Sequence, residues 1–305
     1  MMKKTIQFSK FSLVAVILSS ILIIAGIVSL FVRGMNWGLE FKPGQNVQVE
    51  VVYNDVNADK ITQVLAAQGI NASVKAAGNQ NTYQIRTAAD EGAESAIRSV
   101  LVKEYGKQNV VVEQSQSISA QFSSSLIRGS ILLVLATLVL IFVYTLIRFK
   151  WDFALAAVIA VIHDALIMIS FLSFSQLEFT TTSIAAILTI IGYSINATVV
   201  ILDRVRSDEK IVEAKTFSQI MDSALNSTMS RSIITTLTTL FAVFALVIYT
   251  SGDIKNFAIA LVVGLISGCY SSIFISGAFI NFVRRNWKPG AVLPKANVVR
   301  FESEQ

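Results

Sequence analysis

The sequence predicts a polytopic α-helical membrane protein with six transmembrane helices and a ferredoxin-like α+β extracytoplasmic domain between helices one and two. The first observation is composition. Of 305 residues, 53% are hydrophobic and 15% are charged, which is too apolar for a soluble domain of this size. Secondly, six apolar runs reach the roughly 20 residues that a helix needs to cross a bilayer. Thirdly, one polar stretch, residues 33–129, separates the first run from the others.

The first apolar run, Phe11–Val32, follows Lys3, Lys4 and Lys10, an arrangement that also suits a secretory signal. The run is longer than the roughly 7–15 residues of a signal core, and no Ala-x-Ala site follows it. We therefore expect an uncleaved first membrane helix within residues 1–32. The other five runs are Ser130–Ile147, Phe153–Phe174, Thr180–Leu202, Ser232–Tyr249 and Phe257–Val283.

Basic residues indicate the topology, because Lys and Arg are enriched in cytoplasmic segments and an even number of spans places both termini on one side. Most of the 25 basic residues lie in the N-terminus, the turn 148–152, the segment 203–231 and the tail 284–305. The two short loops on the opposite side hold only Lys255. Both termini are therefore predicted to be cytoplasmic, with residues 33–129 outside and residues 130–283 forming the remaining spans.

The polar stretch reads as a small folded domain. Residues 45–53 alternate like a strand, and residues 57–69 have helical spacing, with Asn57 as the cap and Gly69 as the stop. The elements that follow are a hairpin of 70–76 and 81–87 turning at Gly78 and Asn79, a helix over 91–106 and a strand over 109–115. The order β-α-β-β-α-β predicts a ferredoxin-like domain. No catalytic residue is predicted in it.

His163 and Asp164 fall at the middle of the run Phe153–Phe174, near the midplane of the bilayer. A charged Asp costs roughly 2.5–3.5 kcal/mol there on insertion scales, so the pair is a candidate proton or ion relay. The alternative is a buried hydrogen-bonded link between helices, which contributes about 0.6–2 kcal/mol to packing.

Two further patterns lie in the membrane half. The segment 203–231 is amphipathic, with an apolar face from Ile211 to Leu225 and Asp208 and Glu209 among the polar residues, which indicates a helix on the cytoplasmic membrane surface or a solvated linker. In the last run, small residues recur every four positions and predict a packing face, within the chain or against a partner. They are Ala260, Gly264, Gly268, Ser272 and Ser276.

Composition also excludes several function classes. The net charge of +5 is spread among loops instead of lying with aromatic residues on one face, so no nucleic acid is expected as a partner. Cys269 is the only cysteine and cannot form an intrachain disulfide. His163 is the only histidine, which excludes a multi-histidine metal site and an intramembrane hydrolase built on one. No metal and no cofactor are predicted.

Six short stretches of the sequence form a pattern when they are taken together and in order. They are Gly38-Leu39-Glu40-Phe41, Arg148-Phe149-Lys150-Trp151, Val161-Ile162-His163-Asp164, Gly192-Tyr193-Ser194-Ile195-Asn196, Asp203-Arg204-Val205-Arg206 and Ser230-Arg231-Ser232. This pattern resembles the SecF family, the smaller membrane subunit of the bacterial SecD–SecF protein-export complex, which is related to resistance-nodulation-division transporters. The resemblance covers nearly the whole chain from residue 11 to 285.

The resemblance implies a multi-pass protein of the bacterial inner membrane that pairs with SecD beside the SecY channel complex. It implies use of the proton or ion motive force to help move a translocating polypeptide, with no covalent chemistry of its own. The candidate coupling residues are then His163, Asp164, Asn196, Asp203 and Arg231. Membrane lipid is the remaining expected partner.

The sequence departs from the family pattern at two places. The family usually has the motif Gly-Leu-Asp-Phe-Thr-Gly-Gly after the first span. In this sequence the acid of the motif is Glu40, and Pro43 stands where a flexible turn is usual. In the fourth span, Ala197 stands where the family has an acid directly after Asn196, while the usual neighbour of that acid is kept as Arg231. The carboxylate that the family uses in this subunit is therefore replaced by a methyl group.

Two functions from different classes fit these features. The first is an energy-coupling subunit of protein export. The alternative is a half-size exporter of lipid or small molecules built on the same bundle, which would need an apolar cleft in the external domain instead of an open strand edge.

Overall fold

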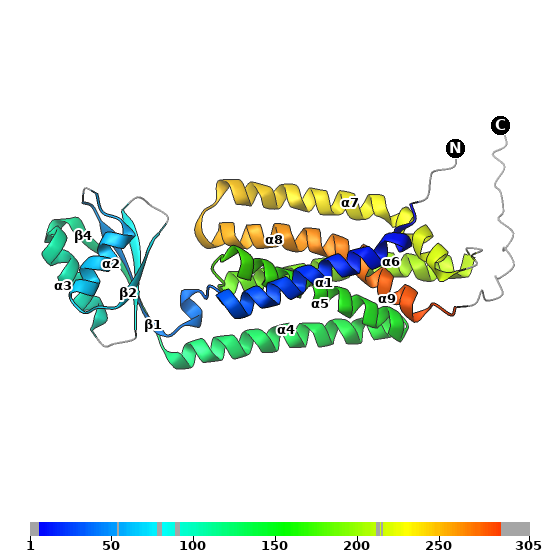
Figure 1. Cartoon of the computed structure of the whole chain (residues 1–305), viewed down its shortest axis with the longest axis horizontal. Helices are drawn as coiled ribbons and strands as arrows, with labels where there is room; N and C mark the ends of the chain where they lie inside the picture. The colour runs from blue at the N-terminus through cyan, green and yellow to red at the C-terminus, as the bar shows by residue number, and fades with distance from the viewer. Residues whose placement is uncertain are drawn as a thin grey trace, which may run out of the picture.

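The computed structural model describes residues 6–53, 55–77, 81–88, 92–211, 214 and 216–287. A helical bundle and a small α+β domain follow one another along the long axis (Figure 1). In the described part of the chain, six helices are long and apolar enough to cross a membrane, which confirms the predicted number. They are α1 (Phe8–Arg33), α4 (Ala120–Arg148), α5 (Trp151–Ser175), α6 (Thr181–Ile211), α7 (Phe217–Tyr249), and α8 (Gly252–Tyr270), which continues through the π-helical turn η3 (Ser271–Ile275) into α9 (Ser276–Val283).

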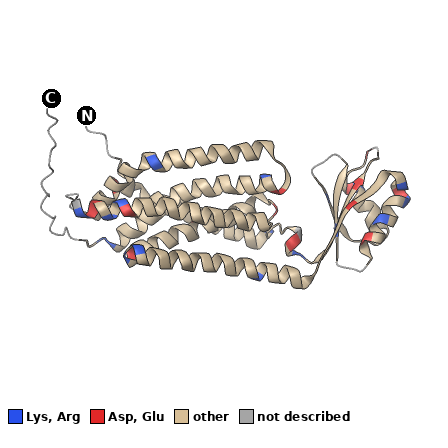
Figure 2. Ribbon diagram, turned by 180° about the vertical axis from the view of Figure 1, so that it is seen from behind, with Lys and Arg blue, Asp and Glu red and all other residues tan. Residues whose placement is uncertain are grey.

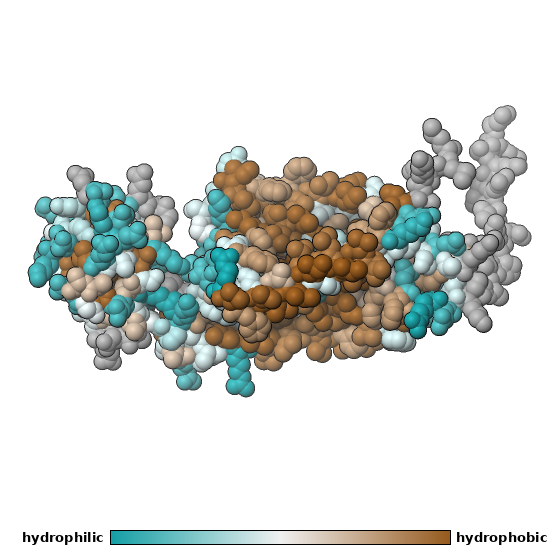
Figure 3. All heavy atoms as spheres, in the orientation of Figure 1, coloured by the Kyte–Doolittle hydropathy of each residue, from teal (hydrophilic) through white to brown (hydrophobic). Residues whose placement is uncertain are grey.

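Hydrophobic residues cover the middle of the bundle and polar residues cover its two ends (Figure 3). The Lys, Arg, Asp and Glu residues gather mainly at those ends and on the small domain (Figure 2). The described N- and C-terminal helical ends, in α1 and α9, lie at the end of the bundle away from the domain (Figure 1). This distribution is the one expected for a bundle that spans a bilayer with the domain on one side.

The helix α4 is longer than the run that hydropathy indicated. It begins at Ala120, ten residues before Ser130, and the Ser119 Oγ accepts a hydrogen bond from the Phe122 amide at 3.2 Å. The extra turns are polar, with four hydroxyl or amide side chains before Leu126, so an apolar window does not detect them. The predicted boundary of the small domain at residue 129 therefore falls inside a continuous helix.

The small domain has the predicted ferredoxin-like order of elements. It contains β1 (Gly44–Val51), α2 (Ala58–Ala67), β2 (Ala72–Ala76), β3 (Thr82–Thr87), α3 (Ala93–Tyr105) and β4 (Val110–Ile118), with one-turn helices η1 (Leu39–Phe41) and η2 (Lys107–Asn109). All neighbouring strands are antiparallel, in the order β2-β3-β1-β4. This is the split βαβ arrangement, and it leaves β2 and β4 as the two edges.

Alternation along β1 builds the core of the domain. Val47, Val49 and Val51 are fully buried and pack with residues of α2 and α3, such as Ile61 and Leu101. The opposite face of the sheet carries polar side chains and is not covered by these helices. The domain therefore presents one polar sheet face.

The local signals that were predicted for the first helix of the domain are present. The Asn57 Oδ1 accepts a hydrogen bond from the Lys60 amide at 2.9 Å, and Gly69 follows the end of α2 with φ of 79°. The predicted hairpin turn at Gly78 and Asn79 lies outside the described residues.

The segment after α1 fastens the domain to the bundle. The Gly38 amide donates to the Phe179 carbonyl at 2.8 Å, and the Phe179 amide donates to Asn36 at 2.7 Å. A Cβ at Gly38 would lie 2.9 Å from the Phe179 oxygen, so this approach requires glycine. The Glu40 carboxylate accepts from the Thr181 amide and hydroxyl at 2.9 and 3.0 Å, which caps the N-terminus of α6.

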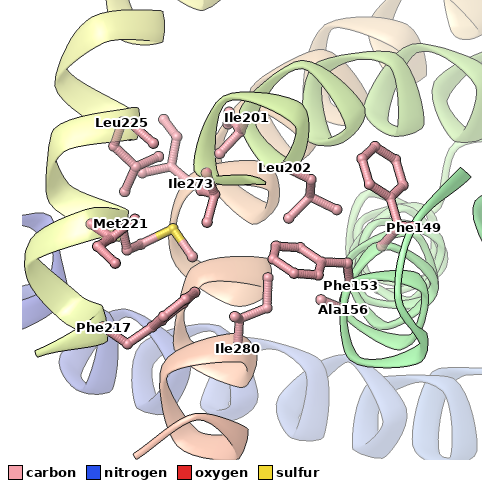
Figure 4. Packing of buried hydrophobic residues seen from close by; sticks show 14 residues of the cluster. Phe149, Phe153, Ala156, Ile201, Leu202, Phe217, Met221, Leu225, Ile273 and Ile280 are labelled. Carbon is pink, nitrogen blue, oxygen red and sulfur yellow. The ribbon is translucent and has the colours of Figure 1, made fainter. Parts of the chain in front are cut away.

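The amphipathic segment 203–231 is not a helix on the membrane surface, and that prediction was wrong. Its two halves extend α6 and α7. Its apolar face, including Phe217, Met221 and Leu225, is buried within the chain against Phe153 (Figure 4). The pattern could not distinguish protein from lipid as the partner of this face, because both are apolar.

Two acids of that segment, one buried and one half-buried, also make contacts within the bundle, although their pattern placed them on the polar face. The Asp208 side chain is fully buried and accepts from the Ser223 hydroxyl at 3.0 Å. Glu209 binds Arg284, whose guanidinium also reaches Asp152 at 2.5 Å. These ion pairs tie α5, α6 and the residue after α9 together. The side chains of Ile211 and Lys215 lie outside the described residues.

Candidate ion-coupling site

Asp164 is completely buried at the middle of α5, where four groups, each from a different element, lie within hydrogen-bond distance of its carboxylate. Three are serine hydroxyls and one is the neighbouring imidazole. They are Ser194 Oγ of α6 at 2.5 Å, Ser267 Oγ of α8 at 2.6 Å, Ser271 Oγ of η3 at 2.7 Å and His163 Nδ1 at 3.2 Å. Both carboxylate oxygens are therefore satisfied without any residue outside this chain.

The hydroxyl partners matter because each can donate or accept. An ionised carboxylate needs donors, whereas a protonated carboxyl group donates one hydrogen bond and needs an acceptor. A serine hydroxyl meets either need by rotating its hydrogen, with no movement of heavy atoms. The site can therefore hold Asp164 with or without a proton, which a site lined only by N–H donors could not do.

His163 is buried beside this site, with 7% of its surface exposed. Its ring stacks on Tyr270 with centroids 6.0 Å apart, and the Tyr270 hydroxyl donates to the Ala15 carbonyl of α1 at 2.6 Å. The His163 Nε2 has no hydrogen-bond partner among the described residues. The imidazole therefore has one nitrogen on Asp164 and one nitrogen without a partner.

The small-residue ridge of the last span packs within this chain. Gly264 and Gly268 face α6, because a Cβ at these positions would lie 2.4 Å from Ile190 and 3.2 Å from Ser194. In an α-helix a spacing of four residues overshoots each turn by about 40°. The wider turn η3 offsets part of this drift, and Ala260, Ser272 and Ser276 are buried as well.

The close approach of α8 to α6 also explains the serine cluster. Ser194 lies against Gly268, one residue from Ser267, so the missing side chain lets the two hydroxyls reach the same carboxylate. The turn η3 begins at Ser271, the third hydroxyl. Turns of this type occur often at functional sites.

The remaining predicted coupling residues lie away from Asp164. Asn196 and Arg231 are exposed, and both line a pocket of about 60 Å³ between α6 and α7 together with Ala197. Tyr193 closes one side of it by donating to the Thr235 carbonyl at 2.9 Å. The methyl group of Ala197 thus shares a pocket with Arg231, and the guanidinium binds no carboxylate of the described residues.

Asp203 has a different neighbour. Its carboxylate pairs with Arg148 Nη2 at 2.7 Å, with 49% and 46% of the two side chains exposed. Arg206 donates to the Arg148 carbonyl at 3.1 Å, so the two charged motifs of the sequence meet at the bundle end away from the domain. Exposed pairs of this kind contribute about 0–1 kcal/mol, so Asp203 serves this turn and not the buried centre.

The sequence reasoning missed Ser194, Ser267 and Ser271. Ser267 and Ser271 are four residues apart, which places them on one helix face, directly beside the predicted small-residue ridge. That spacing was a usable signal. Within the described ranges, no three His, Cys, Asp or Glu side chains come together as they would around a metal ion.

These features define a class: a polytopic membrane protein with a polar cluster buried in its bundle and one α+β domain beyond it. The family description "Protein export membrane protein SecD/SecF, C-terminal" matches residues 98–286, and "SecD/SecF GG Motif" matches residues 28–52. The chain therefore belongs to the SecD/SecF family of protein-export membrane proteins.

Relatives place the chain on the SecF side of the family. It is 32% identical to protein translocase subunit SecF of Borreliella burgdorferi over 92% of this chain and 97% of that protein. It is 44% identical to SecF of Treponema pallidum over 66% of this chain and 48% of that protein. The chain is a SecF-type subunit of protein translocation.

The fold is shared with a solved structure. The crystal structure of SecDF from Thermus thermophilus, described as a translocon-associated membrane protein, superposes with a TM-score of 0.83 at 26% identity. The match covers 93% of this chain and 39% of that chain. This chain thus spans well under half of SecDF.

Proposed function

We propose that this chain works with SecD, beside the SecY channel complex, to help move a polypeptide across the bacterial inner membrane, driven by the proton or ion motive force. The SecDF match supports the partnership, because the part of SecDF that this chain does not cover leaves room for a SecD half. No covalent chemistry is assigned to the chain.

We assign the coupling step to Asp164. The observation that carries this assignment is the carboxylate buried among three hydroxyls and an imidazole, a site that suits both protonation states. Ala197 strengthens it, because the pocket around Arg231 holds no carboxylate from this chain's described residues. Asp164 is thus an acid of this chain that lies near the middle of a membrane-spanning helix.

The topology that we propose has both termini in the cytoplasm and the α+β domain outside. The basic residues support this orientation, since Arg148, Arg206 and Arg284 all lie at the bundle end away from the domain. The domain then stands where a polypeptide leaves the channel. Its edge strand β4 has nine residues without Lys, Arg or Pro, and an extended chain can add to such an edge.

The alternative, a half-size exporter of lipid or small molecules, fits the domain less well. The cleft between the domain and the bundle, about 410 Å³, is lined mainly by Lys, Arg, Asn, Gln and Ser side chains. A carrier of apolar cargo needs an apolar cleft.

The experiment is export of a reporter protein into inverted membrane vesicles that contain SecD and the channel complex, with or without this chain and with or without a proton gradient. We expect the gradient to stimulate export only when the chain is present. Equal stimulation without the chain would remove the coupling role, and failure to co-purify with SecD would remove the partnership.

A further inference from the structure

A cleft of about 410 Å³ lies between the polar sheet face of the domain and the near end of the bundle. Its domain side comes from β2 and β3, and its bundle side comes from the segment after α1 and the loop between α5 and α6. The lining includes Trp37, Lys42, Lys75, Arg86 and Glu178. Nothing in the proposed export function uses this cleft.

The cleft contains more positive than negative charge. Its lining includes three cations, Lys42, Lys75 and Arg86, and one anion, Glu178. Lys75 and Glu178 form an ion pair at 3.8 Å, which is longer than a hydrogen bond. The cleft therefore has an excess of positive charge, with Glu178 as its carboxylate on the bundle side.

Arg86 is the cation of the cleft for which an anionic hydrogen-bond acceptor would be most favourable. It is half-buried, and its guanidinium donates no hydrogen bond to any described residue. Burial lowers the pKa of Arg86, while the nearby Glu178 carboxylate raises it. A planar guanidinium with free N–H groups is well suited to a phosphate.

The cleft lies at the depth of lipid head groups. The helix α1 has 26 residues and is about 39 Å long, so it extends beyond the roughly 30 Å hydrocarbon core. Trp37 follows four residues after its end, and Glu178 lies in the short loop between α5 and α6. Tryptophan is enriched at this level of membrane proteins.

We infer that this cleft binds the head group of a membrane phospholipid that carries both a phosphate and a primary ammonium, as phosphatidylethanolamine does. The phosphate would lie against Arg86 and the lysines, and the ammonium would donate to Glu178. An acidic peptide would satisfy the cations but would repel Glu178. A phosphatidylglycerol head group would offer the phosphate, but its neutral glycerol would form no ion pair with Glu178.

The test is native mass spectrometry of the purified full-length chain in detergent with added phosphatidylethanolamine, phosphatidylcholine or phosphatidylglycerol. Phosphatidylcholine keeps the phosphate, but its ammonium has no N–H to donate. We expect phosphatidylethanolamine to bind about tenfold more tightly than either other lipid, which corresponds to about 1.4 kcal/mol, because only its ammonium can donate a hydrogen bond to Glu178.

Two variants separate the two halves of the site. Arg86→Gln should weaken binding of all three lipids about fivefold, whereas Glu178→Gln should abolish only the preference for phosphatidylethanolamine. Arg98→Gln and Glu104→Gln change exposed residues of α3 in the same way and serve as controls.

Several outcomes would overturn the inference. Equal binding of the three lipids would exclude a head-group site with two charges. Full competition by glycerophosphoethanolamine would show a site for a soluble phosphate compound, and preferential competition by an acidic peptide would assign the cleft to polypeptide. Unchanged binding in Arg86→Gln would show that the lipid binds elsewhere.

Discussion

Asp164 and Arg231 are both ionisable residues of the membrane half that the sequence analysis predicted to take part in coupling, but they differ in burial and in hydrogen bonding. Asp164 is fully buried and receives four hydrogen-bonding groups from its own chain. Arg231 is exposed and shares a small pocket with Ala197. The carboxylate is hydrogen-bonded within this chain, and the guanidinium is exposed at the surface of the bundle.

The difference shows that the type of residue alone does not predict whether a charged side chain is buried and hydrogen-bonded. A buried charge is tolerated only when it is paired or hydrogen-bonded. The carboxylate meets that condition through serines of α6, α8 and η3, whereas the guanidinium of Arg231 is exposed and needs no such partner. The following predictions test this contrast, from the largest expected effect to the smallest.

Replacing the buried acid should have the largest effect on stability. Asp164→Ala leaves three hydroxyls without their acceptor, and we expect a loss of about 3 kcal/mol in the free energy of unfolding. Thermal unfolding of the purified full-length chain measures it. Asp203→Ala removes an exposed carboxylate in the same way and should cost under about 1 kcal/mol. Equal losses would mean that the buried cluster is not special.

Removing one hydroxyl should cost less. Ser271→Ala deletes a single donor at the π-helical turn and should destabilise the chain by about 1–2 kcal/mol, with the carboxylate still held by the other groups. Ser124→Ala, on the exposed first turns of α4, is the matched control and should change little. A loss as large as that of Asp164→Ala would show that Ser271 supports the turn itself.

The cap of α6 links the domain to the helix that carries Ser194. Glu40→Ala should cost about 1 kcal/mol, because the Thr181 amide loses its acceptor at the helix start. Hydrogen exchange should increase at the first turn of α6 and stay constant at Ser194. Exchange that rises along the whole helix would contradict a local cap.

Restoring an acid beside Arg231 should have the smallest effect on stability and a measurable one on export. Ala197→Asp places a carboxylate in the pocket with the guanidinium, and an exposed pair contributes about 0.2–1 kcal/mol. We expect a modest increase in gradient-stimulated export with the same SecD. Equal stimulation of the two forms would show that position 197 does not couple in this protein.

How much the sequence predicted depended on whether the signal was local. The cap at Asn57 and the order of strands follow from neighbouring residues, and both are confirmed. The depth of Asp164 also follows from chain length alone. Its serine partners do not, because they come from helices more than 29 residues away whose rotation about their axes is set by packing.

The burial of Asp208 and the partial burial of Glu209 were missed for a related reason. An amphipathic pattern shows which residues share a face but not what covers that face. Here Arg284, 75 residues further along, binds Glu209 and allows that acid to be half-buried. The apolar half of the same segment was assigned to lipid and is covered by protein instead.

The most direct test of the assignment to Asp164 is gradient-dependent export by Asp164→Asn at normal protein level. The amide keeps the size and most hydrogen bonds of the carboxyl group but cannot bind and release a proton. We expect export without the gradient to continue and the stimulation by the gradient to disappear. Full stimulation in Asp164→Asn would contradict the account and leave the buried cluster as a link between helices.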